Sequence, residues 1–221
     1  MTREEFLKDL KDGRELFHDL NFEFMDFSNL TLTGISFHGC RLGSADFSKT
    51  VLVNCYFDNA ILTRAKFQSS RFLQCELQNA ILEHASFIGS ELEKTNFAGA
   101  VFDNALLYSS KFIGCIINKA RFRHCKVQYS NLSGCQMSEA DLDLADLVGS
   151  NLSGVDLTDA SMDGVHAPGV DFTRATLVRT SLRDAVFTNA NLTEADLSNA
   201  RLDGIYLLGA YLMGTIFQTS E

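Results

Sequence analysis

The chain has 221 residues, of which 46% are hydrophobic, and its formal net charge of −9 at pH 7 disfavours non-specific binding to the phosphates of nucleic acid. No apolar run approaches the ~20 residues of a membrane-spanning helix, and the charged N-terminal residues lack the apolar stretch of a signal peptide. We therefore expect a cytoplasmic protein that has no membrane partner.

The first predicted element is a short helix over residues 2–12. Thr2 and Glu5 have the spacing of a capping box, and Gly13 is placed to end the helix. Its apolar face consists of Phe6, Leu7 and Leu10. We expect residues 1–14 to form a helical cap on the domain that follows, residues 15–221.

A five-residue period governs that second region. Every fifth residue from Phe17 to Phe217 is large and apolar, most often Phe or Leu, with Ala167 as the one small member. A period of five fits neither a helix, which repeats every 3.6 residues, nor a strand, which repeats every two. It indicates a repeat architecture in which stacked units share one core.

All six cysteines fall two residues before a large apolar position, where most other repeats carry Ala, Ser, Thr or Val. They are Cys40, Cys55, Cys75, Cys115, Cys125 and Cys135. The slot requires a small side chain, and free cysteine behaves as a small buried hydrophobe. We predict free thiols and neither disulfides nor a zinc site, since no Cys-x-x-Cys pair occurs.

The repeated unit is small, polar, Phe or Leu, polar, and any residue, with clear copies at residues 45–49, 190–194 and 195–199. This unit resembles the A(D/N)LXX motif of the pentapeptide-repeat family over roughly residues 15 to 219. The resemblance implies an all-β fold: a right-handed quadrilateral β-helix of about ten coils, with four pentapeptides in each coil. Residues twenty apart would then stack, with an interior stack of Phe27, Phe47, Phe67 and Phe87.

An outward column of this fold would carry Ile61, Ile81 and Val101. Such an apolar stripe suits binding to another protein. The same residues are also good strand formers, so an unspecialised β surface is the alternative.

Between Val127 and Asp171 the chain has eight acidic residues and no Lys or Arg. The acidic residues are Glu139, Asp141, Asp143, Asp146, Asp156, Asp159, Asp163 and Asp171. A surface lined with carboxylates can compete for a groove that binds nucleic acid. We therefore treat these eight residues as a candidate partner-binding surface.

The family's quinolone-resistance members imitate duplex DNA and occupy the DNA-binding saddle of gyrase or topoisomerase IV. The resemblance thus implies a DNA-mimicking modulator of a type II topoisomerase that protects against quinolones or toxins. A basic group at residues 111–126 interrupts the acidic surface, and the extended loops and dimerising helix of those members are absent. The alternative is a protein–protein interaction scaffold or regulator with no DNA mimicry.

Pro168 is the only proline, and it follows the small Ala167. Because proline has no backbone N–H, we expect the loss of a ladder hydrogen bond and a local bend or widened coil. A recognition feature is the other interpretation of this position.

The last repeats carry apolar residues at positions that are polar elsewhere: Tyr206, Leu208, Tyr211, Met213 and Ile216. An exposed apolar patch usually marks an interface, and a two-fold homodimer through this end would cover it. Local self-packing and a different partner are the alternatives. Quinolone-resistance members also dimerise through their C-terminal ends.

The sequence lacks the motifs of the common enzyme classes, including a glycine-rich phosphate loop, a His-x-x-x-His pair and a nucleophilic serine elbow. We expect no catalytic residues, no metal and no cofactor. The predicted function is that of a non-catalytic protein that recognises another protein through its surface, without binding nucleic acid directly.

Overall fold

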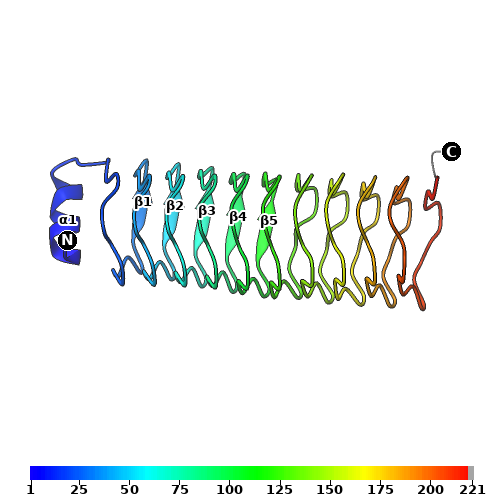
Figure 1. Ribbon diagram of the computed structural model, residues 1–221. Helices are drawn as coiled ribbons and strands as arrows, with labels where there is room; N and C mark the ends of the chain where they lie inside the picture. Colours follow the sequence, from blue (N-terminus) through cyan, green and yellow to red (C-terminus); the bar gives the residue numbers. More distant parts are fainter. Residues whose placement is uncertain (219–221) are drawn as a thin grey trace.

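The structure is a computed structural model that describes residues 1–218. A single helix, α1 (Arg3–Lys11), lies at one end of a long rod, and the chain winds away from it along the rod axis (Figure 1). The regular strands are β1 (Thr31–Thr33), β2 (Val51–Val53), β3 (Arg71–Leu73), β4 (Glu91–Glu93) and β5 (Lys111–Ile113). They form one parallel sheet in the order β1-β2-β3-β4-β5.

Each strand pairs with the chain twenty residues further on, so that Leu32, Leu52 and Phe72 lie in register. Outside the strands, isolated parallel bridges keep the same spacing from Leu16 to Ile216. One turn of the coil therefore takes twenty residues and contains four bridging positions. The fold is a right-handed quadrilateral β-helix, which confirms the predicted class.

The four ladders of bridges define four faces of the rod. Face 1 contains the bridge that begins at Leu16, face 2 the bridge from Asn21, and face 3 the bridge from Asp26. Face 4 contains strands β1 to β5 and continues as bridges to Tyr211. Along a ladder, successive residues lie about 4.8 Å apart, the usual spacing of neighbouring strands.

The prediction of about ten coils is too high for the regular sheet, whose five strands cover four turns. Beyond Ile113 the coils of face 4 are joined by isolated bridges that involve Asn131, Asn151, Asp171 and Asn191. Each of these side chains accepts a hydrogen bond from the backbone N–H two residues further on, at 2.9–3.1 Å. Such local bonds favour turns over extended strand, which ends the regular sheet.

The core is a column of large side chains with small residues between them. Phe27, Phe47, Phe67 and Phe87 are fully buried, and their successive ring centroids lie 4.5, 5.1 and 4.7 Å apart. This confirms the predicted stack. A coil by itself has nothing against which to bury these rings, so the hydrophobic core exists only between coils.

The six cysteines are free and buried, as predicted. The Cys55 thiol donates to the carbonyl of Leu32 in the preceding coil, at 3.4 Å, and Cys115 bonds Leu92 in the same way. Burial raises the pKa of the Cys40 thiol to about 11. The Cys40 thiol therefore stays protonated at neutral pH.

Pro168 fits the coil without the expected loss of a ladder hydrogen bond. The bridges that join His166 to Asp146 and Val186 are intact, and the carbonyl of Pro168 accepts the N–H of Gly149 at 3.0 Å. At the equivalent position of other coils, the N–H of Ser48 and of Val148 bonds a side chain rather than the ladder. Proline is tolerated there because this position supplies only its carbonyl to the ladder.

The predicted capping box is present at the start of α1. Thr2 Oγ1 accepts the backbone N–H of Glu5 at 3.2 Å, and Glu5 Oε2 accepts the N–H of Thr2 at 2.7 Å. Gly13 follows with a φ of +85°, a conformation that ends a helix at little cost for glycine. The division into a cap at 1–14 and a β-helix at 15–221 stays an interpretation, and residues 219–221 lie outside the described part.

Helix α1 covers the open end of the rod with apolar and polar groups together. Phe6 is fully buried, with its ring centroid 4.9 Å from Phe17 and 5.0 Å from Phe27. Arg3 donates to the carbonyls of Asp26 at 2.6 Å and Ser28 at 3.1 Å. In later coils the equivalent carbonyls accept ladder bonds, so Arg3 replaces a missing coil.

Among residues 1–218, no helix combines the length and the apolar character needed to cross a bilayer.

We predict that Phe6→Ala destabilises the protein by about 3–5 kcal/mol, the usual cost of removing a buried phenylalanine. Chemical denaturation monitored by circular dichroism measures this loss. Leu16→Ala is the control, because Leu16 is 60% exposed at the same end of the rod. Equal effects of the two substitutions would show that α1 is not a packed cap.

Candidate functional site

Face 2 carries the predicted apolar stripe. Ile61, Ile81 and Val101 follow one another in its ladder of bridges. Ile61 is 40% exposed and Ile81 36% exposed, so their side chains form a continuous apolar surface in contact with solvent. Ile61 also lines a shallow cavity of about 450 Å³ together with Phe24, which is largely exposed.

Beyond Val101 the same ladder becomes charged and polar. Arg121 forms an ion pair with Asp103, and the guanidinium of Arg123 contacts Asp141 at 2.8 Å and Asp143 at 3.0 Å. Asp103 and Asp143 are not in the ladder itself, because they lie two residues after ladder positions. The apolar stripe thus passes directly into a network of opposite charges on the same face.

A simple rule connects neighbouring coils of face 2: a ladder residue bonds the residue eighteen positions before it. Arg41 bonds Glu23 at 2.7 Å, and Ser161 donates to Asp143 Oδ1 at 2.5 Å. Ser181 donates in the same way to a carboxylate of the preceding coil. The rule follows from the geometry of the coil. One turn takes twenty residues, and the bonded residue lies two positions after the ladder position of the preceding coil, which gives a separation of eighteen.

The environment of Asp143 favours its ionised form. Partial burial opposes ionisation, but hydrogen bonds from Ser161, from Arg123 and from the backbone N–H of Asp163 outweigh it and hold the pKa of Asp143 below its usual value. The carboxylate is therefore a fixed part of the face. A lowered pKa stabilises the folded state at pH values above the unfolded pKa, which is about 3.9, and this stability is lost as the pH falls through the folded pKa.

The eight acidic residues predicted as one surface lie on all four sides of the rod. Asp141, Asp143 and Asp163 belong to face 2, and Glu139 and Asp159 lie at the corner that precedes it. Of the remaining three, Asp156 lies on face 1, Asp146 on face 3 and Asp171 on face 4. The structure brings five of them together and separates the other three.

Basic residues of neighbouring coils compensate most of these acids. Lys119 lies 3.5 Å from Glu139 and Lys126 lies 3.6 Å from Asp146, both from the coil before the acidic segment. Arg179 binds Asp159 through two hydrogen bonds of 2.6 Å, from the coil after it. Whether these carboxylates bind a partner stays a prediction, but their surface is one of alternating charge.

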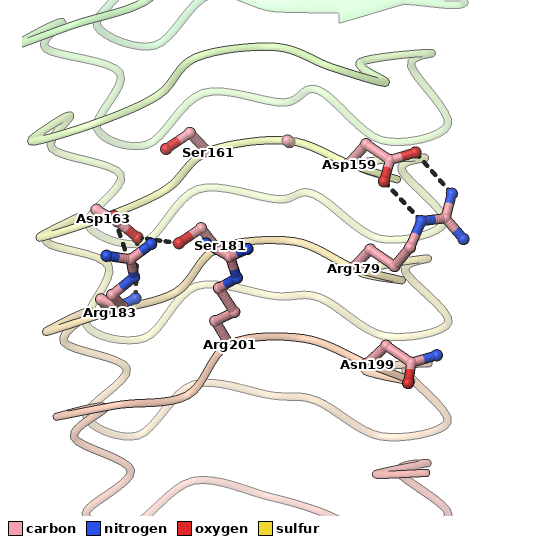
Figure 2. Close-up of a pocket in the computed structure, with 9 residues that line it drawn as sticks. Asp159, Ser161, Asp163, Arg179, Ser181, Arg183, Asn199 and Arg201 are labelled. Carbon is pink, nitrogen blue, oxygen red and sulfur yellow. Dashed lines mark hydrogen bonds and ion pairs between the residues drawn. The ribbon is translucent and has the colours of Figure 1, made fainter. Parts of the chain in front are cut away.

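A groove lies across face 2 in the last coils. It has a volume of about 550 Å³, and the charged side chains that line it are Asp159, Asp163, Arg179, Arg183 and Arg201 (Figure 2). We call it the arginine groove. Asp163 accepts the Ser181 hydroxyl at 2.5 Å and the backbone N–H of Arg183 at 3.0 Å, and lies 3.7 Å from Arg183 Nε.

Three exposed apolar side chains at the corners of the coil were missed at the level of sequence: Phe24, Tyr129 and Leu144. All have a positive φ of 57–62°, where bulky residues are strained. The Tyr129 ring lies so close to Gly149 that a Cβ there would come within 2.9 Å of it. The sequence could have revealed them, because the same position of most other repeats, two residues after the large apolar residue, holds glycine or a polar residue.

The C-terminal end of the described chain is apolar on its outer side. Its five predicted interface residues are between 44% and 74% exposed: Tyr206, Leu208, Tyr211, Met213 and Ile216. Two residues of the core series, Leu212 and Phe217, are also exposed here, at 41% and 43%. Their interface role stays a prediction.

Within residues 1–218, no group of three or more His, Cys, Asp or Glu side chains is arranged to hold a metal ion. The rings of His18 and His38 lie 5.8 Å apart, and His18 Nε2 contacts the Ser36 hydroxyl at 2.9 Å. The arrangement of face 2 suits recognition of a surface, since its cavities are shallow and most of its carboxylates are paired with arginines.

We predict that Asp143→Asn lowers the free energy of unfolding by about 1 kcal/mol at pH 7, the typical value of such hydrogen bonds. The difference from the wild type is expected to shrink as the pH falls below about 4, because the wild-type carboxylate then becomes protonated. Denaturation curves at pH 7, 5 and 3 test this. Asp203→Asn on the same face is the control, and an equal, pH-independent effect of both would contradict the assignment.

Comparisons with known proteins agree with the geometry. Segments of the chain at residues 40–79, 80–118, 115–154, 150–189, 168–204 and 190–218 match the sequence profile described as "Pentapeptide repeats (8 copies)". No curated protein sequence gives a significant match.

Among solved structures, the chain is similar to HetL, a pentapeptide repeat protein involved in heterocyst differentiation regulation from the cyanobacterium Nostoc sp. strain PCC 7120. The identity is 26% and the TM-score 0.70, over 98% of this chain and 97% of HetL. QnrB1, a plasmid-mediated fluoroquinolone resistance protein, shares 21% identity over 88% of this chain and 89% of QnrB1, with a TM-score of 0.49. The likeness to QnrB1 is too weak to carry an argument about activity.

Proposed function

The chain belongs to the pentapeptide repeat family, and we propose that it is a non-catalytic protein that binds another protein through face 2 of its β-helix. The observation that supports this most directly is the apolar stripe of Ile61, Ile81 and Val101, which continues into the charge network of Arg121 and Arg123. Protein interfaces combine such apolar centres with polar, charge-matched surroundings.

The exposed residue Phe24 adds to the argument. It extends from a left-handed corner beside Ile61 and gains little core burial in return, since it is 78% exposed. Strain and exposure at one position are features of residues selected for binding. HetL, which matches this chain along its whole length, is described as involved in the regulation of heterocyst differentiation. A regulatory role of this chain would rest on the same kind of surface recognition.

We predict that Ile81→Asp weakens binding of the partner at least about tenfold, because it places a charge in the centre of the apolar stripe. A photo-crosslinker at position 81 in the source organism identifies the partner, and titration with the purified partner measures the affinity. Ile116→Asp is the matched control, because Ile116 is 37% exposed and lies on face 1. Equal affinities of the two variants would contradict the assignment of face 2.

DNA mimicry towards a type II topoisomerase is the second candidate function. It is favoured by the carboxylates of Glu83, Asp103, Asp143 and Asp163, which belong to one outward column of face 2. The basic partners of three of them weaken the resemblance to a phosphate backbone.

A gyrase or topoisomerase IV supercoiling titration, with and without a quinolone, separates the two candidates. Binding through the apolar stripe predicts no inhibition and no drug protection at tens of micromolar protein. DNA mimicry predicts both effects, and their loss in the double variant Asp143→Lys/Asp163→Lys. The double variant Asp156→Lys/Asp196→Lys on face 1 is the control, because it changes the net charge by the same amount.

We further propose that the chain forms a homodimer through its C-terminal coil. The backbone N–H groups of Leu207 and Leu212 find no hydrogen-bond acceptor within the described residues, whereas those of Phe187 and Leu192, one coil earlier, do. Unpaired edges beside exposed apolar side chains favour association. A two-fold arrangement would cover both features in a closed assembly.

We predict that Tyr211→Asp/Met213→Asp converts the dimer to a monomer, because it places two charges in the apolar contact. Sedimentation equilibrium at 1–50 µM, on the order of ordinary dimer affinities, measures the mass. Ile113→Asp is the control, because Ile113 is 50% exposed on face 4 but far from the end. A wild-type protein that sediments as a monomer throughout this range would refute the dimer.

A further inference from the structure

The last charged position of face 2 breaks the pairing rule of that face. From Arg121 to Ser181, each ladder residue has a complementary group eighteen residues earlier: Asp103 for Arg121, Arg123 for Asp141, Asp143 for Ser161 and Asp163 for Ser181. For Arg201, the residue eighteen positions earlier is Arg183. Two guanidinium groups therefore occupy a position at which the four preceding pairs are complementary.

The surroundings leave this pair of arginines without full compensation. Arg201 forms no ion pair with any residue in the described chain, although Asp203 follows two positions later on the same face. Arg183 lies 3.7 Å from Asp163, which already accepts the Ser181 hydroxyl and the backbone N–H of Arg183. The Asp159 carboxylate is held by Arg179 through two hydrogen bonds.

Figure 2 shows Arg201 extending from its coil toward Ser181, on the side of the groove where Arg183 lies. Both arginines line the arginine groove of about 550 Å³. Arg183 and Arg201 are diagonal neighbours on adjacent coils, since Ser181 is the residue opposite Arg201, and like charges on adjacent strands of one face repel one another. Guanidinium groups bind phosphate and carboxylate oxygens with strong, charge-assisted hydrogen bonds.

We propose that Arg183 and Arg201 form a binding site for an oxyanion, a phosphate or carboxylate group carried by the protein that docks on face 2. The site deepens the proposed function, because it states which chemical group the partner presents at the C-terminal part of the face. The oxyanion lies between the two guanidinium groups and relieves their repulsion. Binding at this site stabilises the folded protein, since the unfolded chain lacks the paired arginines.

The test uses inorganic phosphate and acetate as probes of the isolated protein. Isothermal titration at low ionic strength is expected to show phosphate binding with a dissociation constant in the millimolar range and weaker acetate binding, because phosphate carries more charge. Arg201→Gln is expected to weaken phosphate binding at least about tenfold. Asp203→Asn is expected to strengthen it, because it removes a negative charge from the same end of face 2.

Thermal stability is an independent test, because the same substitution that weakens phosphate binding is expected to stabilise the folded protein. Arg201→Gln is expected to raise the midpoint of thermal unfolding at about 10 mM salt, and the gain should vanish at about 0.5 M, where charges are screened. A purely structural arginine would lower the midpoint instead. The control is Arg64→Gln, since Arg64 is also an exposed arginine without an ion pair among residues 1–218, and this change should alter neither measurement.

Two results would overturn the proposal. One is phosphate binding that is equal in the wild type and in Arg201→Gln. The other is a phosphate effect on the wild type no larger than that of chloride at the same ionic strength. These measurements need no partner, so a negative result leaves the Ile81→Asp test of face 2 unaffected. If phosphate binds as expected but Ile81→Asp does not weaken partner binding, the oxyanion site does not serve protein recognition.

Discussion

The parallel pairing of each residue with the residue twenty further on is the constraint on which the whole molecule depends. A single coil has neither partners for its backbone N–H and carbonyl groups nor a surface against which to bury its large side chains. Stacking solves both problems at once, as the rings of Phe27 and Phe47 at 4.5 Å and the ladder bonds beside them illustrate. The polar requirements of the backbone thus set the spacing at which the apolar core is packed.

The same constraint makes the ends of the rod chemically special. At the N-terminal end, α1 supplies Phe6 for the core and Arg3 for the carbonyls, so one short helix replaces a coil in both respects. At the other end of the described chain, Leu212 and Phe217 belong to the core series but are exposed. The contrast explains why the proposed dimer contact lies at that end.

Stacking also decides what the surface presents to a partner. Side chains eighteen or twenty residues apart meet, so Arg123 and Lys119 neutralise carboxylates that lie far from them in the chain. The face that results is matched in charge, and the positions that depart from matching become the informative ones. These are the apolar stripe around Ile81, in the N-terminal half of face 2, and the pair Arg183 and Arg201, at its C-terminal end.

Much of the fold could be predicted because a five-residue period acts at every position of the chain. The period identified the core series, the buried slot of the six cysteines and, with the family motif, the coil of twenty residues. The helix followed from local signals alone, since Thr2 and Glu5 are three residues apart. The extent of the regular sheet was harder to predict, because it depends on whether side chains such as Asn131 accept a hydrogen bond from the backbone of their own turn.

The sequence by itself determined which residues lie inside and which lie outside, because burial follows the period and needs no knowledge of neighbours. Only the tertiary structure decided the electrostatic character of the outside. Residues 127–171 contain no Lys or Arg, yet Lys126 and Arg179 from adjoining coils neutralise acids within that segment. Charge acts through space over a few ångströms, and in a coil the nearest charges are one turn away rather than adjacent in the chain.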